Sequence, residues 1–192
     1  MPHISKKTEV LKAALTIIEN EGVHAVTYDA LATATGMSKS GLIYHFPSRH
    51  DLLIECHRFC AARWEAELEE LAGGKQAAEL DKKERLRALV QSLGKNDPLI
   101  ELLMSIHSQQ HPDFMEQWHG VDKRWLPDPA ADDQTALIAT ILGNGLWVHD
   151  HLTERKIPTA TRKKTVELVL EFLDSGKLQT ALKRPGFSSY LS

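Results

Sequence analysis

The sequence predicts an all-α protein, in which a three-helix headpiece is joined to a larger helical body. Three observations support this fold class. Apolar residues recur every three or four positions along most of the 192 residues, which is the spacing of one face of an α-helix. No segment alternates apolar and polar residues over the length of a strand. Glycine and proline clusters interrupt the apolar pattern at a few places, so each helix can be bounded in turn.

The first helix is expected from Ser5 to about Glu21. The hydroxyl of Ser5 can cap this helix, and Gly22 is a residue at which helices often end. Between these residues the apolar positions follow one helical face, namely Val10, Ala13, Ala14, Ile17 and Ile18. This face is expected to pack against the helices that follow.

Residues 27–46 have the pattern of two short helices joined by a tight turn. Thr27 can cap the first helix, Gly36 allows the turn, and Ser38 can cap the second helix. The residues expected to give these helices their inward faces are Leu31, Ala32, Leu42, Ile43 and Phe46. This arrangement, with polar side chains exposed at the start of the second helix, is typical of a DNA-binding helix-turn-helix.

The helix-turn-helix offers side chains for two kinds of DNA contact. Lys39 and Ser40 lie where a recognition helix meets base edges in the major groove. Thr27 and the amide groups beside it can bind a phosphate at a helix N-terminus. The predicted DNA-binding residues are Thr27, Ser38, Lys39, Ser40, Gly41, Tyr44, His45 and Arg49. In the alternative interpretation, the aromatic residues of this set pack inside the protein and its arginine is a solvated charge.

This array resembles the DNA-binding domain of the TetR family of one-component transcriptional regulators, and the resemblance is best over residues 5–64. The matching positions are Thr27, Leu31, Ala32, Gly36, Ser38, Lys39, His45, Phe46, Ser48 and Arg49. The sequence departs from the family pattern at Ser40, where glycine is frequent, and at Ile43, where tyrosine is frequent. The resemblance implies a regulator that binds an inducer in its body and dimerises through its last two long helices.

The charge of the headpiece is balanced. Residues 1–58 contain six lysines and arginines and six aspartates and glutamates, and the whole chain contains 23 against 26. The basic residues that could face one duplex are Lys6, Lys7, Lys39 and Arg49. We therefore expect a modest non-specific affinity for DNA that falls with salt through a few phosphate contacts.

A long helix is expected from Ser48 to about Leu71, followed by Gly73 and Gly74. It would link the headpiece to the body. The only two cysteines of the chain, Cys56 and Cys60, lie one helical turn apart, which is wider than a disulfide requires. They are expected to be core thiols, and a redox switch is the alternative. The expected domains are a DNA-binding domain at 1–47, a connecting helix at 48–72, a ligand-binding and dimerisation domain at 73–176 and a polar tail at 177–192.

The body is expected to contain five helices and a proline-rich loop at 127–133. The predicted helices span about 81–93, 98–108, 112–125, 133–152 and 161–173. Apolar residues cover more than one face of each of the last two helices, which is excessive for a helix half exposed to water. We expect 133–152 and 161–173 to form a homodimer interface, because a twofold axis would also place two recognition helices over a palindromic operator. Alternatively, these apolar residues face other helices of the same subunit.

Aromatic and methionine residues of the body suggest a site for a small-molecule effector. Phe114, Trp118 and Trp125 can share a helix face, with Met104, Met115 and Trp147 as neighbours. Such a site would take a flat hydrophobic or cationic molecule, with Glu101, Glu116 or Asp150 as counter-charge. The residues proposed to line it are Met104, His107, Phe114, Trp118 and Trp147. The alternative for each is ordinary core packing.

The histidines raise the alternative of a metal-responsive regulator. The densest group in the sequence is His107, His111, His149 and His151, with Asp113 and Asp150 nearby. His107 and His111 have the spacing at which one helix face presents two imidazoles to a cation. Pro112, however, disfavours helical geometry at the residue before it, which disturbs this spacing. No metal or cofactor is therefore assigned from the sequence.

Other classes of protein find less support. The sequence has no Gly-x-Ser-x-Gly, phosphate-binding glycine loop or His-Glu-x-x-His motif, so an enzyme is only a remote alternative. No apolar run reaches the roughly 18 residues of a membrane span, and the N-terminus lacks the apolar stretch of a secretion signal, so a cytoplasmic location is expected. The sequence predicts a homodimeric repressor that a small hydrophobic or cationic molecule releases from a palindromic, double-stranded operator.

Overall fold

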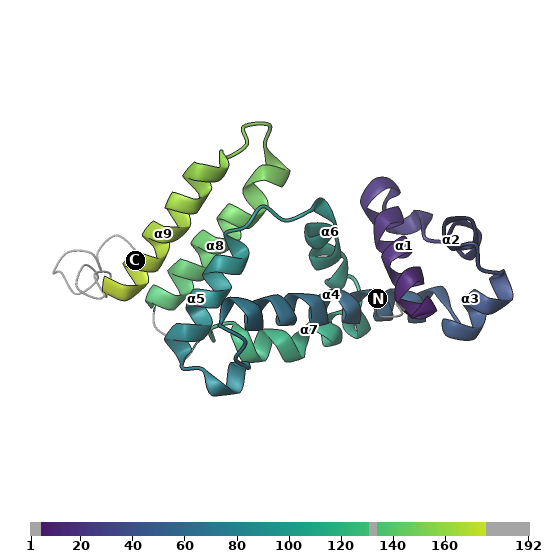
Figure 1. The fold of residues 1–192 in the computed structure, drawn as a ribbon, viewed down its shortest axis with the longest axis horizontal. Coiled ribbons are helices and arrows are strands. Elements are labelled where there is room, and N and C mark those ends of the chain that lie inside the picture. Colours follow the sequence, from purple (N-terminus) through teal and green to yellow (C-terminus); the bar gives the residue numbers. More distant parts are fainter. Residues whose placement is uncertain (1–4, 131–133, 176–192) are drawn as a thin grey trace. The chain divides into compact units, whose positions relative to one another are not determined.

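The computed structural model describes residues 5–130 and 134–175, and these residues form α-helices joined by short connections (Figure 1). No β-strand occurs within these ranges, which confirms the all-α fold class. The α-helices are α1 (Lys6–Glu21), α2 (Tyr28–Thr35), α3 (Lys39–His45), α4 (Arg49–Leu71), α5 (Lys82–Leu93), α6 (Leu99–Ser108), α7 (Pro112–Trp125), α8 (Gln134–Leu152) and α9 (Thr159–Ser175). Two 3₁₀ helices that the sequence did not predict are η1 (Val23–Ala25) and η2 (Ala77–Glu79).

Local capping residues explain why most helix ends lie within two residues of their predicted positions. The Ser5 side chain accepts a hydrogen bond from the Thr8 amide, and α1 ends at Gly22, whose φ is 88°. Asp81 starts α5 with a reciprocal capping box. Helix α9 begins two residues before its predicted start. The predicted tail at 177–192 and the loop residues 131–133 lie outside the described residues.

The described residues form two compact units. One contains the described residues up to Trp64 together with Pro98–Gly120, and the other contains Glu65–Asp97 together with the described residues from Val121 onward. Helices α4 and α7 contribute residues to both units. The sequence assigned all of 98–120 to the body, whereas here these residues pack with the N-terminal helices. The functional domain boundaries remain a prediction.

The core of the N-terminal unit joins α1 to α4 with α6 and the start of α7. It includes Ile18, Leu31, Leu42, Phe46 and Leu52 from the headpiece and Ile100, Met104 and Phe114 from α6 and α7. Cys56 and Cys60 are buried and free, as expected for core thiols. Burial raises the pKa of the Cys60 thiol to about 11 and that of Cys56 further, so both thiols stay protonated.

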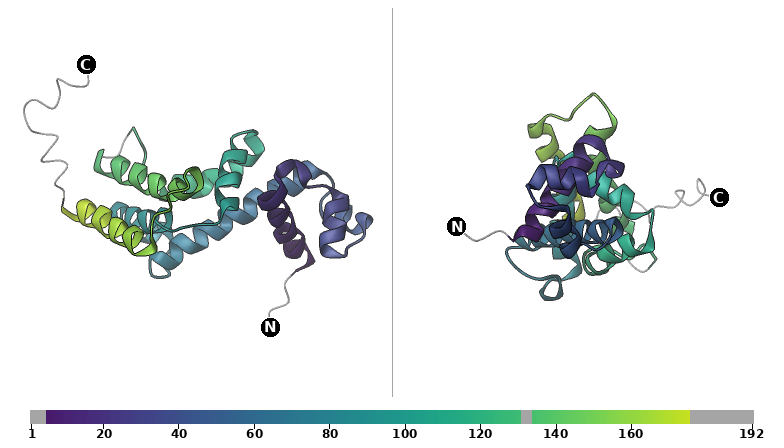
Figure 2. Two further views of the ribbon diagram at one scale, coloured as in Figure 1. Left: turned by 90° about the horizontal axis from the view of Figure 1, so that it is seen from above. Right: turned by 90° about the vertical axis from the view of Figure 1, so that its right-hand side faces the viewer.

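In the C-terminal unit, α5, α8 and α9 pack against one another, and α8 and α9 lie side by side (Figures 1 and 2). Buried Arg162 on α9 forms an ion pair of 2.9 Å with buried Asp150 on α8. Asp150 also accepts a hydrogen bond from the Ile157 amide at 3.0 Å. That bond and those from His149 and Arg162 hold the pKa of the Asp150 carboxyl well below its usual range. These contacts fix the connection between the two helices.

Among the helices described, none combines the length and the apolar character needed to cross a membrane.

Candidate DNA-binding surface

Two short helices and the turn between them form the candidate surface, and their capping residues are those that the sequence predicted. The Thr27 hydroxyl accepts a hydrogen bond from the Ala30 amide at 3.1 Å, and the Ser38 hydroxyl accepts one from the Gly41 amide at 3.1 Å. Gly36 ends α2 in the left-handed region, with φ 70°. The backbone of the helix-turn-helix is therefore set by local sequence.

Helix α3 has one buried side and one exposed side. Leu42 and Phe46 are 0% and 1% exposed, which anchors the helix on the core of the headpiece. Ile43 is 44% exposed, so the expectation that it faces inward is wrong. A residue next to Leu42 lies about 100° away around the helix and cannot share its buried direction. Tyr44 is 83% exposed, so it is not a packing residue.

The exposed side of α3 presents a mixed surface. Lys39 and Ser40 are exposed at its first turn, and Ile43 and Tyr44 are exposed one turn later. Sequence reasoning missed Ile43 as a surface residue, although its spacing of three and four from Ser40 and Lys39 could have placed it on the same side. The Lys39 ammonium forms an ion pair of 3.1 Å with Asp29 on α2. Both partners are well exposed, so this pair contributes little and can be exchanged for a phosphate or a base.

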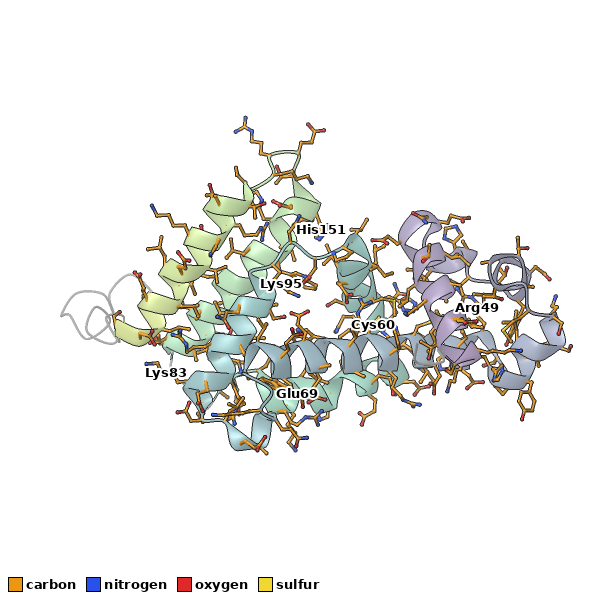
Figure 3. All side chains as sticks on the ribbon, in the orientation of Figure 1. Arg49, Cys60, Glu69, Lys83, Lys95 and His151 are labelled. Carbon is orange, nitrogen blue, oxygen red and sulfur yellow. The ribbon has the colours of Figure 1, made fainter. Side chains whose placement is uncertain are left out.

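The Arg49 side chain (labelled in Figure 3) binds the headpiece itself. Its Nε donates to the Val26 carbonyl at 2.9 Å, and a terminal nitrogen donates to the Val23 carbonyl at 2.6 Å. These bonds tie the start of α4 to η1 and to the residue before Thr27. Arg49 therefore has a visible positioning role, and its predicted contact with DNA stays a prediction.

A shallow hollow of about 220 Å³ lies at the N-terminus of α2. Its lining includes Thr27, Lys39 and Arg49, which bring a hydroxyl and two cationic side chains to one place, together with Val26, Tyr28, Asp29 and Leu52. Groups of this kind suit an anion such as a DNA phosphate.

The residues predicted to bind an effector are divided between the two units. Met104, His107, Phe114 and Trp118 belong to the N-terminal unit, whereas half-buried Trp147 belongs to the C-terminal unit. Met104 and Phe114 are part of the packed core. His107 lines a hollow of about 390 Å³, whose wall also includes Ile18, Arg49, Leu103, Ile106 and Gln110. Whether any of these residues touches a ligand stays a prediction.

A hydrogen-bonded chain inside the N-terminal unit involves a histidine that sequence reasoning missed. The Trp118 indole donates to Nδ1 of His57 at 3.1 Å, and Nε2 of His57 lies 2.9 Å from Nδ1 of His107. An indole nitrogen can only donate, so His57 accepts at Nδ1, carries its proton on Nε2 and donates to His107. Burial, with a contribution from His107, lowers the pKa of His57 to about 4. No local pattern marks His57, because its partners are 50 and 61 positions away.

The histidines that are densest in the sequence do not form one group. His107 bonds to His57, while His111 lies beside Asp113 in the N-terminal unit. His149 belongs to the C-terminal unit and bonds to Asp150.

Comparison with known proteins covers both units. The family model described as bacterial regulatory proteins of the tetR family matches residues 10–56, and the model described as the tetracyclin repressor-like C-terminal domain matches residues 83–174. The HTH-type transcriptional regulator RutR of Escherichia coli K12 is 36% identical over 64 residues. This match spans 33% of the chain and 30% of RutR.

Solved structures of two transcriptional regulators and of one multidrug binding protein share the fold over most of the chain. A regulator from Rhodococcus sp. Rha1 has a TM-score of 0.66 and 15% identity, with 90% of this chain and 97% of that chain covered. A regulator from Saccharomonospora viridis in complex with choline has a TM-score of 0.63 and 21% identity, with 88% and 95% covered. The multidrug binding protein EbrR, complexed with imidazole, has a TM-score of 0.55 and 19% identity, with 88% and 96% covered.

Proposed function

The chain belongs to the TetR family of bacterial regulatory proteins, and we propose that it is a homodimeric repressor that a small hydrophobic or cationic molecule releases from a palindromic operator. The observation that carries this proposal is the capped helix-turn-helix, whose second helix is anchored by Leu42 and Phe46 and exposes its other side. Members of a family of transcriptional regulators are generally not enzymes, and the proposal assigns no catalytic residue.

The exposed side of α3 would enter the major groove. Lys39 and Ser40 would contact base edges, where lysine commonly pairs with the acceptors of guanine. Ile43 would add an apolar contact of the kind that reads the methyl group of thymine. Tyr44, His45 and Arg49 would contact the flanking phosphates, together with Thr27. Ser38 and Gly41 would shape this surface at the start of the helix.

The homodimer would form through about 133–152 and 161–173. Support comes from large apolar side chains that a single subunit leaves in water: Ile141 is 58% exposed, Leu142 46% and Leu168 54%. Two apolar residues lie side by side on α8, and the third lies on the neighbouring α9. A second copy related by a twofold axis would bury them and would present two recognition helices to two half-sites.

The effector would be small and either hydrophobic or cationic. Supporting this class, a relative of similar fold was solved with choline, a quaternary ammonium compound, and aromatic side chains such as Phe114 and Trp118 attract cations of this kind. The candidate contacts are Met104, His107, Phe114, Trp118 and Trp147. Release of DNA requires the effector to bind one conformation more tightly than the other, because equal affinity would leave the equilibrium unchanged.

Selection of DNA fragments from a random library tests the proposal directly. We expect the purified full-length chain to enrich a palindromic sequence and to shift it in a gel as a complex of two chains per site. Choline and aromatic ammonium compounds would then be screened for release of the selected fragment. Failure to enrich any sequence, together with binding that is equal for all duplexes, would refute the assignment of α3 as a recognition helix.

A further inference from the structure

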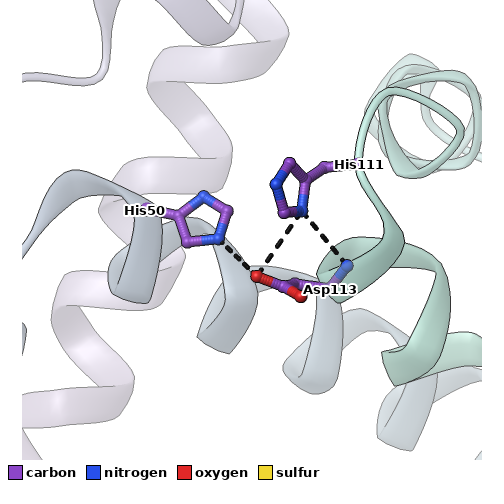
Figure 4. A group of neighbouring side chains, drawn as sticks. All are labelled: His50, His111 and Asp113. Carbon is purple, nitrogen blue, oxygen red and sulfur yellow. Dashed lines mark hydrogen bonds and ion pairs between the residues drawn. The ribbon is translucent and has the colours of Figure 1, made fainter.

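Two histidines and an aspartate from separate segments meet in the N-terminal unit (Figure 4). His50 lies in the first turn of α4, His111 immediately precedes α7, and Asp113 lies in the first turn of α7. Nε2 of His50 is 2.8 Å from Oδ2 of Asp113, and Nδ1 of His111 is 3.5 Å from the same oxygen. One potential ligand atom from each residue lies within 4.8 Å of the other two.

A buried aromatic ring holds both imidazoles in place. The ring of Phe114, which is 5% exposed, lies 5.0 Å from the His50 ring and 5.4 Å from the His111 ring, measured between centroids. The two imidazoles also contact each other edge to face, with centroids 4.7 Å apart. These ring contacts favour one orientation of each imidazole before any ligand binds, which assists metal binding.

A cation could replace the hydrogen bonds that now join this group. The Asp113 amide donates to Nδ1 of His111 at 3.2 Å, so this nitrogen is unprotonated, and an ion would take its lone pair in place of the amide hydrogen. The 3.5 Å between that nitrogen and Oδ2 of Asp113 is too long for a good hydrogen bond. It matches the separation of about 3.3 Å between two ligands of one tetrahedral ion with bonds of about 2.0–2.2 Å. The ion would replace the proton that His50 shares with Asp113.

We propose that His50, His111 and Asp113 bind one divalent transition-metal ion, such as Zn²⁺, Co²⁺ or Ni²⁺, which ties the first turn of α4 to the first turn of α7. Two imidazoles and one carboxylate suit such ions, whereas Ca²⁺ and Mg²⁺ prefer oxygen ligands alone. The remaining coordination positions would hold water, because His111 and Asp113 are exposed. The site differs from the set suggested by the sequence, since His50 replaces His107, His149 and His151.

A titration of the metal-free, full-length chain with Co²⁺ tests the site, because a bound tetrahedral Co²⁺ ion absorbs visible light. We expect one equivalent per chain to bind and Zn²⁺ to displace it. His50→Gln and Asp113→Asn should each weaken binding by at least about tenfold, as loss of a direct ligand exceeds the effect of its supporting contacts. The matched controls His119→Gln and His149→Gln should bind Co²⁺ like the unaltered chain. Far-UV circular dichroism of each variant checks that it is folded.

Several outcomes would overturn the proposal. The first is that the unaltered chain does not bind Co²⁺. The second is that His50→Gln and Asp113→Asn bind Co²⁺ as tightly as the unaltered chain does. The third is that His149→Gln loses Co²⁺ binding. A thiolate-to-cobalt absorption band would also overturn it, because it would place the ion on Cys56 or Cys60.

A consequence for regulation rests on the proposed function. Helix α4 starts four residues after the end of α3. An ion at the first turn of α4 would therefore restrict the position of the short connection between α3 and α4. Zn²⁺ should therefore change the affinity for the selected operator in the unaltered chain and not in Asp113→Asn. Metal binding is measured without DNA, and operator binding is measured first without metal. Failure of the metal site and failure of the proposed function would thus be distinguished.

Discussion

At the scale of single residues, Arg49 shows how one side chain can stabilise the backbone of the headpiece. It donates to the Val23 and Val26 carbonyls, which lie just before the capped start of α2. A guanidinium group suits this task because its nitrogens point in fixed directions and stay charged. The residue that the sequence marks as a phosphate contact therefore also anchors the segment just before the helix-turn-helix.

Arg49→Ala should lower the free energy of unfolding by about 1–2 kcal/mol, because two hydrogen bonds from a charged group are lost at a partly exposed place. Urea unfolding followed by circular dichroism measures this change. Arg58→Ala is a suitable control, since Arg58 on α4 is itself exposed and bonds to Glu55 and Gln117, not to the segment before α2. Equal stability of the two variants would contradict the positioning role. Operator binding by Arg49→Ala should fall for all sequences alike.

Lys39 is the residue at which the recognition of DNA bases can be tested. Lys39→Ala should weaken operator binding by about 1–3 kcal/mol and relax the preference at one base pair, as expected for a direct base contact. Asp29→Asn, which removes the ion-pair partner of Lys39, should leave the preference intact. Gel-shift titrations on the selected operator and on single-base variants measure both effects. Unchanged affinity in Lys39→Ala would remove this residue from the recognition surface.

The buried pair of His57 and His107 predicts a loss of stability in acid. Burial lowers the pKa of His57 to about 4 in the folded chain, against 6.5 for the free side chain, and it also lowers the pKa of His107. Between these values the unfolded chain binds more protons than the folded one, so stability falls as the pH drops from 6.5 towards 4. The contribution of His57 amounts to roughly 3 kcal/mol over the whole window.

Urea unfolding at pH 7.5 and pH 5 measures this dependence. His57→Gln, whose amide can still accept from Trp118 and donate to His107, should give a flatter dependence than the unaltered chain. His119→Gln, at an exposed site, should not change it. A dependence that is as steep in His57→Gln as in the unaltered chain would contradict the assignment to this pair.

At the scale of elements, local signals in the sequence determine most of the fold. Ser5, Thr27, Ser38 and Asp81 cap helices where they stand in the sequence, because capping depends on residues only three positions apart. The inward direction predicted for Ile43 is wrong, because apolar character alone does not determine which side of a short helix is buried. The packing of α6 with α1 also could not be read locally, since it joins residues about 80 positions apart, as in the bond from the Ile100 amide to Glu19.

The end of α5 and α9 are in close contact, and a pair of substitutions can measure the energetic coupling across this contact. A Cβ atom on Gly94 would lie 2.2 Å from a methyl carbon of Val166. Gly94→Ala should therefore cost about 1–3 kcal/mol by overpacking. Val166→Ala removes that methyl group, so the double variant should be more stable than the sum of the two single effects predicts. Urea unfolding of all four proteins measures the coupling, and additive effects would contradict the close contact.

At the scale of the whole molecule, the proposed operator binding depends on a second copy of the chain. One α3 helix contacts only a few base pairs, and two half-sites are needed for useful specificity. The exposed apolar side chains of α8 and α9 support dimerisation, because a second copy could bury them. The sequence pointed to these two helices through their excess of apolar residues, but only the structure separates the positions that pack inside the unit from those that remain exposed.

Replacing two of the exposed positions should separate the copies without unfolding either one. Ile141→Lys with Leu168→Lys places two charges on side chains that are 58% and 54% exposed in the single chain, so the fold of each subunit should tolerate them. In a dimer the same charges would be buried without partners, which is costly. Light scattering should therefore give the mass of one 21.5 kDa chain for the double variant and twice that mass for the unaltered protein.

Met115→Lys, at a 40% exposed position on α7, is the control that should stay dimeric. The double variant should also lose its preference for the palindrome over a single half-site. A double variant that keeps the dimer mass would show that the copies meet through another surface.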